Sequence, residues 1–258
     1  MRYEWGYTWL LMGCCGIAMA GESVFKNSTS DISSTGEHNA ITLALQRMAP
    51  TATIDSVRAS GMPGLMEVVV SGEVLYFSTD GKFLLQGRLV DTGKRSDLTA
   101  ETEKGLRATA LKTIGPDKRL SFAAENPKHH VTIFTDVDCS YCRKLHQEIA
   151  EYNRAGISVD YLFFPRAGLN SPSFDKAAFI WCADDRQQAM NQSMTTAGLA
   201  HSAVKCANPI GETMALGQRI AKAGTPTILS ADGSFLGGYQ TAQELTARLT
   251  AQNAQSVP

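Results

Sequence analysis

The sequence has no run of basic residues and little net charge. Its 24 Lys and Arg stand against 25 Asp and Glu, which gives a formal net charge of −1. Affinity for nucleic acid comes largely from cationic contacts with phosphates, so this balance argues against a nucleic-acid partner. Low-complexity tracts are also absent, and 43% of the 258 residues are hydrophobic, which excludes the disordered class. The length allows one large domain or two modest ones, each with its own core.

A long apolar run is missing too. The apolar stretch over 7–18 is too short to span a membrane comfortably, but it leads into Ala18-Met-Ala20, a small-x-small pattern at which export signals are cleaved. We therefore predict a signal peptide over 1–20, cleavage after Ala20, and an exported protein. The alternative is a lipoprotein, because Leu11-Met-Gly-Cys14 resembles a bacterial lipobox that would be lipidated at Cys14.

Cysteine is scarce as well. The sequence has 6, and the predicted cleavage removes the first two, at positions 14 and 15. The other four form a close pair, Cys139 with Cys142, and a distant pair, Cys182 with Cys206. An oxidising compartment disfavours unpaired thiols, so we interpret the distant pair as a structural disulfide, with about 3 kcal/mol of stabilisation in the chain-entropy model. Two buried free thiols are the alternative.

The close pair is the motif Cys139-Ser-Tyr-Cys142, which directly follows the strand-like run 131–134. A predicted helix follows and ends at Gly156, with apolar side chains at helical spacing in Cys142, Leu145, Ile149 and Tyr152. Cys139 is therefore expected at a helix N-terminus, where free N–H groups and the helix dipole favour a thiolate. A thiolate there is a nucleophile for disulfides, and Cys142 is placed to resolve what it attacks. The pattern predicts a thiol–disulfide enzyme.

Half of a zinc site has the same spacing. Zinc needs four ligands, usually from a second C-x-x-C or a closely spaced His pair. The remaining cysteines, Cys182 and Cys206, lie far apart, and no second His follows His146 at ligand spacing. We therefore expect no metal and no cofactor.

The expected elements divide the chain into three parts. A polar leader over 23–37 precedes a helix over 38–48 and a sheet-rich module with turns at 71–72 and 80–81. The next part is a helix over 97–114, whose thin apolar stripe fits a linker or hinge and fits packing into a core equally well.

The third part begins after Pro116 with a β-α-β pattern: 131–134, the motif helix, and 157–164. Helices over 174–182, 185–194 and 212–223 precede a hairpin over 227–236. The last helix opens with the capping box Thr241-x-x-Glu244. This is the order of an α/β thioredoxin-like fold with a helical insertion.

Several of these segments resemble the bacterial periplasmic disulfide isomerases of the DsbC/DsbG family. They are 134–146 around the motif, Trp181-Cys182, Gly224-Thr-Pro226, Gly238-Tyr-Gln240, and 74–82 with 85–87 upstream. The resemblance runs from about His38 to the final helix. It is closer to DsbC in the stretch Lys144-Leu-His146.

The resemblance implies a periplasmic V-shaped homodimer. An α+β dimerisation domain over 21–90 would pair with its copy, a helical linker over 91–116 would set the arm angle, and 117–258 would be the catalytic domain. The apolar cleft between the arms would hold misfolded exported proteins with wrong disulfides, which also implies chaperone activity. A membrane reductase of the DsbD type would keep the thiols reduced.

The resemblance also assigns roles to residues. Cys139 would attack a substrate disulfide and Cys142 would release a trapped substrate. Thr225 and Pro226 would form a cis-proline loop beside the motif, with the Thr225 backbone free to pair with an extended substrate. The dipeptide Ser140-Tyr141 departs from the usual Gly-Tyr. The change is small, so we expect the cysteine pair to keep the balance between reduced and oxidised forms that suits an isomerase.

The charged neighbours of the motif have no fixed role at this stage. Arg143 would favour the Cys139 thiolate, whereas Asp136 and Asp138 would oppose it if they lie close. His146 fits a packed helix residue better than a proton carrier. Other functions also remain open: a dithiol oxidase, a reductase for a dedicated client, and a non-enzymatic holdase or metal-delivery chaperone.

Overall fold

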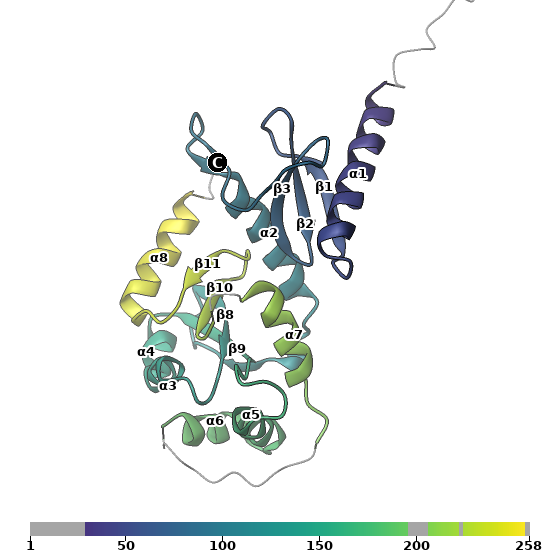
Figure 1. Ribbon diagram of the computed structural model, residues 1–258. Helices are drawn as coiled ribbons and strands as arrows, with labels where there is room; N and C mark the ends of the chain where they lie inside the picture. Colours follow the sequence, from purple (N-terminus) through teal and green to yellow (C-terminus); the bar gives the residue numbers. More distant parts are fainter. Residues whose placement is uncertain (1–28, 196–205, 222–223, 256–258) are drawn as a thin grey trace, which may run out of the picture.

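The computed structural model describes residues 29–195, 206–221 and 224–255. In Figure 1, helix α2 (Leu98–Lys112) connects an upper sheet flanked by α1 (Thr29–Met48) to a larger lower part that contains the other helices. The predicted signal peptide, its cleavage site and the candidate lipidation site lie outside the described residues. Within the described ranges, no helix is both long and apolar enough to cross a membrane.

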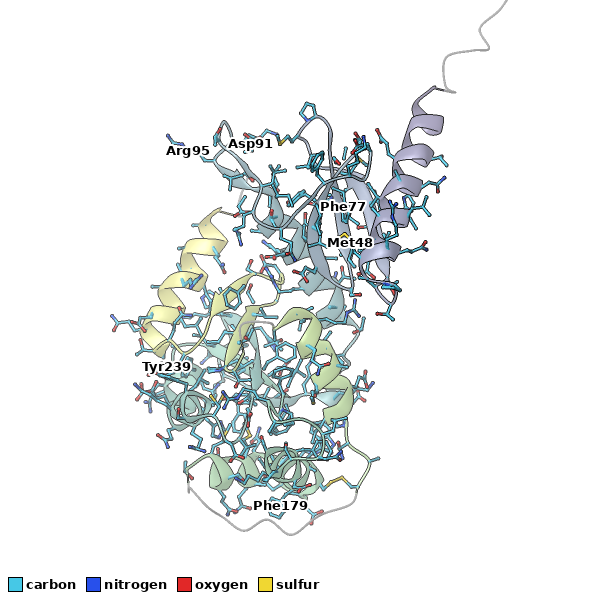
Figure 2. The ribbon with its side chains drawn as sticks, viewed as in Figure 1. Met48, Phe77, Asp91, Arg95, Phe179 and Tyr239 are labelled. Atoms are coloured by element: carbon cyan, nitrogen blue, oxygen red, sulfur yellow. A yellow bond between two sulfur atoms is a disulfide. The ribbon has the colours of Figure 1, made fainter. Side chains whose placement is uncertain are left out.

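The upper part is an antiparallel sheet with α1 packed against it. Its strands, in spatial order, are β1 (Ile54–Ala59), β2 (Leu65–Val70), β3 (Glu73–Ser78) and β4 (Leu84–Leu85). Ile41 and Leu45 of α1 share a core with Val68 and Phe77 of the sheet, and Figure 2 shows Phe77 between the two layers. The predicted turn at 71–72 has φ of 50° and 79°, as a type I′ hairpin requires.

Two features of this part differ from the prediction. Helix α1 begins at Thr29, so a non-helical leader is wrong for 29–37. Thr35 and Gly36 in the added turns are exposed, and an exposed helical turn needs no apolar residue and so leaves no period to detect. Strand β1 was not predicted, because a bulge between Ile54 and Ser56 breaks the alternation by which a strand is recognised.

Helix α2 is tied to the upper sheet at its N-terminal end. A short ribbon of β5 (Val90–Asp91) and β6 (Ser96–Asp97) leads into it. The hydroxyls of Tyr76 and Thr99 share a hydrogen bond of 2.5 Å. One turn later, the Thr102 hydroxyl donates to the buried Glu67 carboxylate at 2.9 Å. These bonds hold the start of the helix on β2 and β3.

The C-terminal end of α2 belongs to the lower core. Leu111 and Ile114 are buried there with Phe134 and Leu229. Arg107 adds a hydrogen bond of 2.7 Å from its Nε to the carbonyl of Gly233. Helix α2 therefore packs against both parts, as one of the two interpretations predicted, and its role as a linker or hinge between domains stays a prediction.

The lower part has a central sheet of five strands in the order β11-β10-β8-β9-β7. They are β7 (Leu120–Phe122), β8 (His129–Thr135), β9 (Ile157–Phe163), β10 (Thr227–Ser230) and β11 (Phe235–Gly237). The central pair β8 and β9 is parallel, and its neighbours run antiparallel to it. Every residue of β9 is buried, which is typical of a strand covered on both faces. Strand β7, after the short 3₁₀ helix Pro116–Lys118, was not predicted.

Helices cover both faces of this sheet. They are α3 (Ser140–Gln147), α4 (Ile149–Arg154), α5 (Pro172–Cys182), α6 (Arg186–Thr195), α7 (Ile210–Ile220) and α8 (Ala242–Gln255). Val131 and Ile133 of β8 face the core formed with α3 to α6 and α8, whereas Phe134 faces the core formed with α2 and α7. The predicted capping box starts α8, with the Glu244 carboxylate accepting from Thr241 N–H at 2.8 Å.

Candidate active site

The motif cysteines lie where β8 ends and α3 begins. Cys139 is the N-cap residue of α3. Its N–H donates to the carbonyl of Asp136 at 3.0 Å, and its own carbonyl accepts from Arg143 N–H at 3.0 Å. Cys142 follows one turn later. Both cysteines are free thiols, and they are only 4% and 1% exposed. The start of α3 therefore places Cys139 at its cap and Cys142 one turn further on, and both side chains are buried.

A distant loop completes the site. The peptide bond between Thr225 and Pro226 is cis, and the Cys139 sulfur lies 3.2 Å from the carbonyl oxygen of Thr225. The fold thus brings Cys139, Cys142 and Thr225 together from segments 86 residues apart in the chain.

The two sulfurs have opposite pKa shifts. The hydrogen bond from the Cys142 thiol is the largest influence on Cys139. Together with backbone N–H groups of α3 and the side chain of Thr225, and against the effect of burial, it lowers the pKa of Cys139 to about 5. Burial, and then the bond to Cys139, raises the pKa of Cys142 well above its usual range. At neutral pH the site holds a thiolate at Cys139 and a protonated thiol at Cys142.

Comparison with known proteins identifies this arrangement. Residues 116–253 match a thioredoxin-like domain, and residues 30–100 match the disulfide bond isomerase protein N-terminal domain. The chain is 37% identical over 199 residues to the thiol:disulfide interchange protein DsbC of Dickeya dadantii, covering 77% of this chain and 81% of that protein. It is 33% identical over 217 residues to DsbC of Salmonella typhimurium, covering 84% of this chain and 89% of that protein. The chain belongs to the DsbC family. It is a thiol:disulfide interchange enzyme.

The acidic neighbours of the motif are both paired with cations in this DsbC-family chain. Asp136 is 2% exposed and accepts hydrogen bonds from Ser173 Oγ at 2.5 Å and Arg166 Nε at 3.1 Å. Although burial raises its pKa, these bonds hold the pKa of Asp136 below its usual range. Asp138 pairs with Lys176 at 2.5 Å. The neighbouring cations therefore offset the effect by which these two carboxylates were predicted to disfavour the Cys139 thiolate.

His146 and Arg143 have no proton-transfer role in this geometry. His146 is 2% exposed, and its ring nitrogens lie 3.2 Å from Tyr161 Oη and 2.9 Å from Asn191 Oδ1. Burial lowers the pKa of His146 to about 4, so the ring is neutral and packs as predicted. The Arg143 guanidinium donates to the carbonyl of Val137 at 3.2 Å and so braces the turn before Cys139.

A surface group beside the motif was missed by sequence reasoning. The ring of Tyr141 is 60% exposed and lies 6.1 Å from the ring of Tyr239, which Figure 2 shows near α3 and α4. The Lys144 ammonium lies 4.5 Å from the centre of the Tyr239 ring, and the Tyr239 hydroxyl donates to the Glu148 carboxylate at 2.8 Å. The segment containing Tyr239 carried the family resemblance, but nothing in the sequence indicated its contact with the motif dipeptide.

The distant cysteine pair forms a disulfide. Cys182 ends α5 and is bonded to Cys206, with 5.9 Å between the two Cα atoms. The bond fastens the segment before α7 to the helical insertion. In the part of the chain that the structure describes, no group of three or more His, Cys, Asp or Glu side chains is arranged to hold a metal ion.

Proposed function

We propose that this DsbC-family enzyme is a periplasmic disulfide isomerase, with Cys139 as nucleophile and Cys142 as resolving residue. The observation that carries the proposal is the position of the Cys139 sulfur, at the N-cap of α3 and 3.2 Å from the carbonyl oxygen of Thr225 in the cis-proline loop. The Cys139 thiolate attacks one sulfur of a wrong substrate disulfide, a mixed disulfide forms, and the other substrate sulfur leaves as a thiolate. That freed thiolate attacks a different substrate disulfide, and a final exchange releases Cys139 in its original reduced state.

Cys142 supplies the alternative exit. When rearrangement stalls, Cys142 attacks the Cys139 sulfur, which expels the substrate sulfur as a thiolate and leaves the enzyme pair oxidised. The substrate gains the two electrons that the enzyme loses. A membrane reductase of the DsbD type then restores the dithiol.

Thr225 and Pro226 form the substrate-binding loop in this proposal. The Thr225 carbonyl lies 3.2 Å from the Cys139 sulfur, so a substrate strand beside it would have its disulfide at the nucleophile. Backbone pairing of this kind selects an extended conformation and not a sequence, which suits an enzyme with many clients.

The remaining assignments concern assembly and export. The proposed domains are a cleaved signal over 1–20, a dimerisation domain over 21–90, a linker over 91–116 and a catalytic domain over 117–258. The dimer is supported by the match of residues 30–100 to an isomerase N-terminal domain, and by apolar side chains that this part exposes: Leu43, Met48, Phe83 and Leu85. Misfolded exported proteins are the proposed substrates.

The test is recovery of activity from a scrambled multi-disulfide protein in a glutathione buffer, with residues 21–258 as the enzyme. Recovery that disappears with Cys139→Ser and persists with the conservative surface change Thr250→Ser supports the isomerase. Rapid oxidation of a reduced substrate without recovery of the scrambled one would instead indicate a dithiol oxidase. Protection from aggregation that survives Cys139→Ser, without any recovery, would indicate a holdase.

A further inference from the structure

The catalytic motif carries an aromatic side chain on the surface of the molecule. Tyr141 lies in the first turn of α3, between the two motif cysteines, and is 60% exposed. A single exposed apolar residue is ordinary on a protein surface. Tyr141 is not single, because the centre of its ring lies 6.1 Å from that of Tyr239, with 31° between the ring planes. This spacing is within the range of interacting aromatic pairs.

The ring of Tyr239 is held in place from α3 and α4. Its hydroxyl donates to the Glu148 carboxylate, with the two oxygens at 2.8 and 2.9 Å. The Lys144 ammonium lies over the same ring, 4.5 Å from its centre. The backbone is held as well, since the carbonyl of Gln240 accepts a hydrogen bond from the Tyr152 hydroxyl. A ring fixed in this way loses little conformational freedom when a ligand packs on it.

The segment that contains Tyr239 also packs against the cis-proline loop. Gly238 precedes Tyr239, and a Cβ at position 238 would lie 3.5 Å from the carbonyl oxygen of Pro226. The carbonyl oxygen of Thr225, on the other side of the cis peptide bond, lies 3.2 Å from the Cys139 sulfur. The two rings therefore extend from the motif to the loop along which a substrate strand is proposed to bind.

We propose that Tyr141 and Tyr239 form a subsite for an aromatic or large apolar side chain of the client, two residues from the cysteine under attack. The inference rests on the proposed roles of Cys139 and the cis-proline loop, and it adds a side-chain preference that backbone pairing does not supply. In an extended segment, side chains two residues apart point to the same face, about 7 Å from each other. When the client cysteine faces Cys139, its second neighbours therefore face the surface beside it.

Such a subsite would favour misfolded clients. A folded protein buries most of its large apolar side chains, whereas a misfolded one exposes them next to its disulfides. Packing of an exposed client side chain on the two rings removes apolar surface from water on both partners. The rings would thus direct the nucleophile toward disulfides that lie in unfolded, apolar segments.

Two small disulfides test the preference. They are disulfide-linked dimers of acetyl-X-Ala-Cys-Ala-X-amide, in which X is Trp in one and Ser in the other, and both are uncharged. The Cys139 thiolate of the reduced protein attacks one peptide sulfur, and the other peptide leaves as a thiolate. Cys142 then attacks Cys139 and releases the second peptide, so the peptide disulfide gains the two electrons that the enzyme pair loses. Acid quenching and mass spectrometry give the rate for each peptide.

The readout is the ratio of the two rates, divided by the same ratio for reduced glutathione in place of the protein. This ratio cancels any general change in the reactivity of Cys139. We expect the parent to prefer the Trp peptide about tenfold, as an aromatic contact implies. Tyr141→Ser and Tyr239→Ser should each reduce the preference to about twofold or less, whereas Tyr141→Phe, which keeps the ring, should retain it.

Phe235→Ser is the matched control, because it removes a ring of the same domain that is 41% exposed and lies outside the proposed subsite. Its preference should equal that of the parent. The proposal is overturned if the parent shows no preference, if Tyr141→Ser keeps it, or if Tyr141→Phe or Phe235→Ser loses it as fully as Tyr141→Ser does. Should Tyr239→Ser fail to fold, the variants of the exposed Tyr141 decide the outcome.

The peptide test is independent of isomerase activity. It requires only exchange at Cys139, so it also applies if the protein proves to be a dithiol oxidase or a reductase. Failure to recover a scrambled protein would count against the proposed function alone. Loss of the peptide preference with normal recovery would count against the subsite alone.

Discussion

The surroundings of Cys139 and of Cys142 differ more than their separation of one helical turn suggests. Cys139 is at the N-cap of α3, where the Cys142 thiol, backbone N–H groups and the Thr225 side chain all favour its thiolate. Cys142 is 1% exposed, in a core that includes Leu145, and burial favours its neutral form. One eight-residue helix thus builds a good nucleophile and a poor one side by side.

Each cysteine shifts the pKa of the other, and this mutual effect has a consequence for turnover. The bond from Cys142 is the largest cause of the low pKa at Cys139, and the bond to Cys139 is one cause of the high pKa at Cys142. Once Cys139 is in a mixed disulfide it carries no charge, so it no longer opposes ionisation of Cys142. Cys142 therefore becomes easier to deprotonate at the stage when its attack is needed.

The largest expected effect comes from removing each sulfur in turn. Cys139→Ser should lower isomerisation to the level of buffer alone, because no other thiolate is available for attack. Cys142→Ala should still form the mixed disulfide at Cys139 but should be unable to release it. Mixed disulfides with substrate should therefore accumulate in cells and be seen as thiol-sensitive bands on gels. Accumulation with Cys139→Ser instead would reverse the assigned roles.

Substitution in the turn before α3, which contains Asp136, should have the next largest effect. Asp136→Ala removes the acceptor of the Ser173 and Arg166 bonds in a buried position, so we expect a loss of about 2–4 kcal/mol in the free energy of unfolding. Denaturant titration of the reduced protein measures this. Asp138→Ala, two residues away and exposed, is the matched control and should cost less than about 1 kcal/mol. Equal losses would mean that burial of Asp136 is not what matters.

The mutual effect can be measured directly at Cys139. Its rate of alkylation in the parent protein should follow a pKa of about 5. In Cys142→Ala, which removes the largest cause of that shift, the alkylation pKa should rise by about one unit or more. An unchanged value would assign the low pKa to the helix N-terminus and Thr225 alone.

Stability should follow the same pKa. The pKa of Cys139 is lowered on folding from 9.0 to about 5, so the unfolded chain binds the extra proton between these values. The contribution of Cys139 to the stability of the reduced protein is therefore fully present above about pH 9 and is lost as the pH falls through 5. The stability difference between the parent and Cys139→Ser, both reduced, should grow from pH 5 toward pH 9. A difference that is flat over this range would contradict the shift.

Much of this site could be predicted because its features are local in sequence. The strand, motif and helix around Cys139 are consecutive, so periodicity and the helix N-terminus were sufficient to infer a thiolate. The loop of Thr225 and Pro226 was found through the family resemblance, since a proline alone does not indicate where in space it will lie.

What the sequence left hidden depends on contacts between distant segments. The bond from Ser173 to Asp136 and the contact of Tyr239 with Tyr141 join residues 37 and about 98 positions apart, and no local pattern encodes them. For β1 and β7, a bulge in one and a length of three residues in the other removed the alternating pattern.

The smallest expected effect concerns the ion pair between Asp138 and Lys176. Asp138 directly precedes Cys139 in the chain. The side chains of Asp138 and Lys176 are 37% and 27% exposed, so solvent screens the pair and its contribution to stability should be under about 1 kcal/mol. Lys176→Gln leaves the Asp138 carboxylate without its cation next to Cys139, which should raise the alkylation pKa of Cys139 by a few tenths of a unit. Asp138→Asn should lower it by a similar amount, and the double variant should return it to the parent value. Because Cys142 is buried and one turn further on, its resolving rate should not respond to either change. A response at Cys142 equal to that at Cys139 would mean that the two sulfurs share one electrostatic environment, and the contrast between them would then have to come from burial alone.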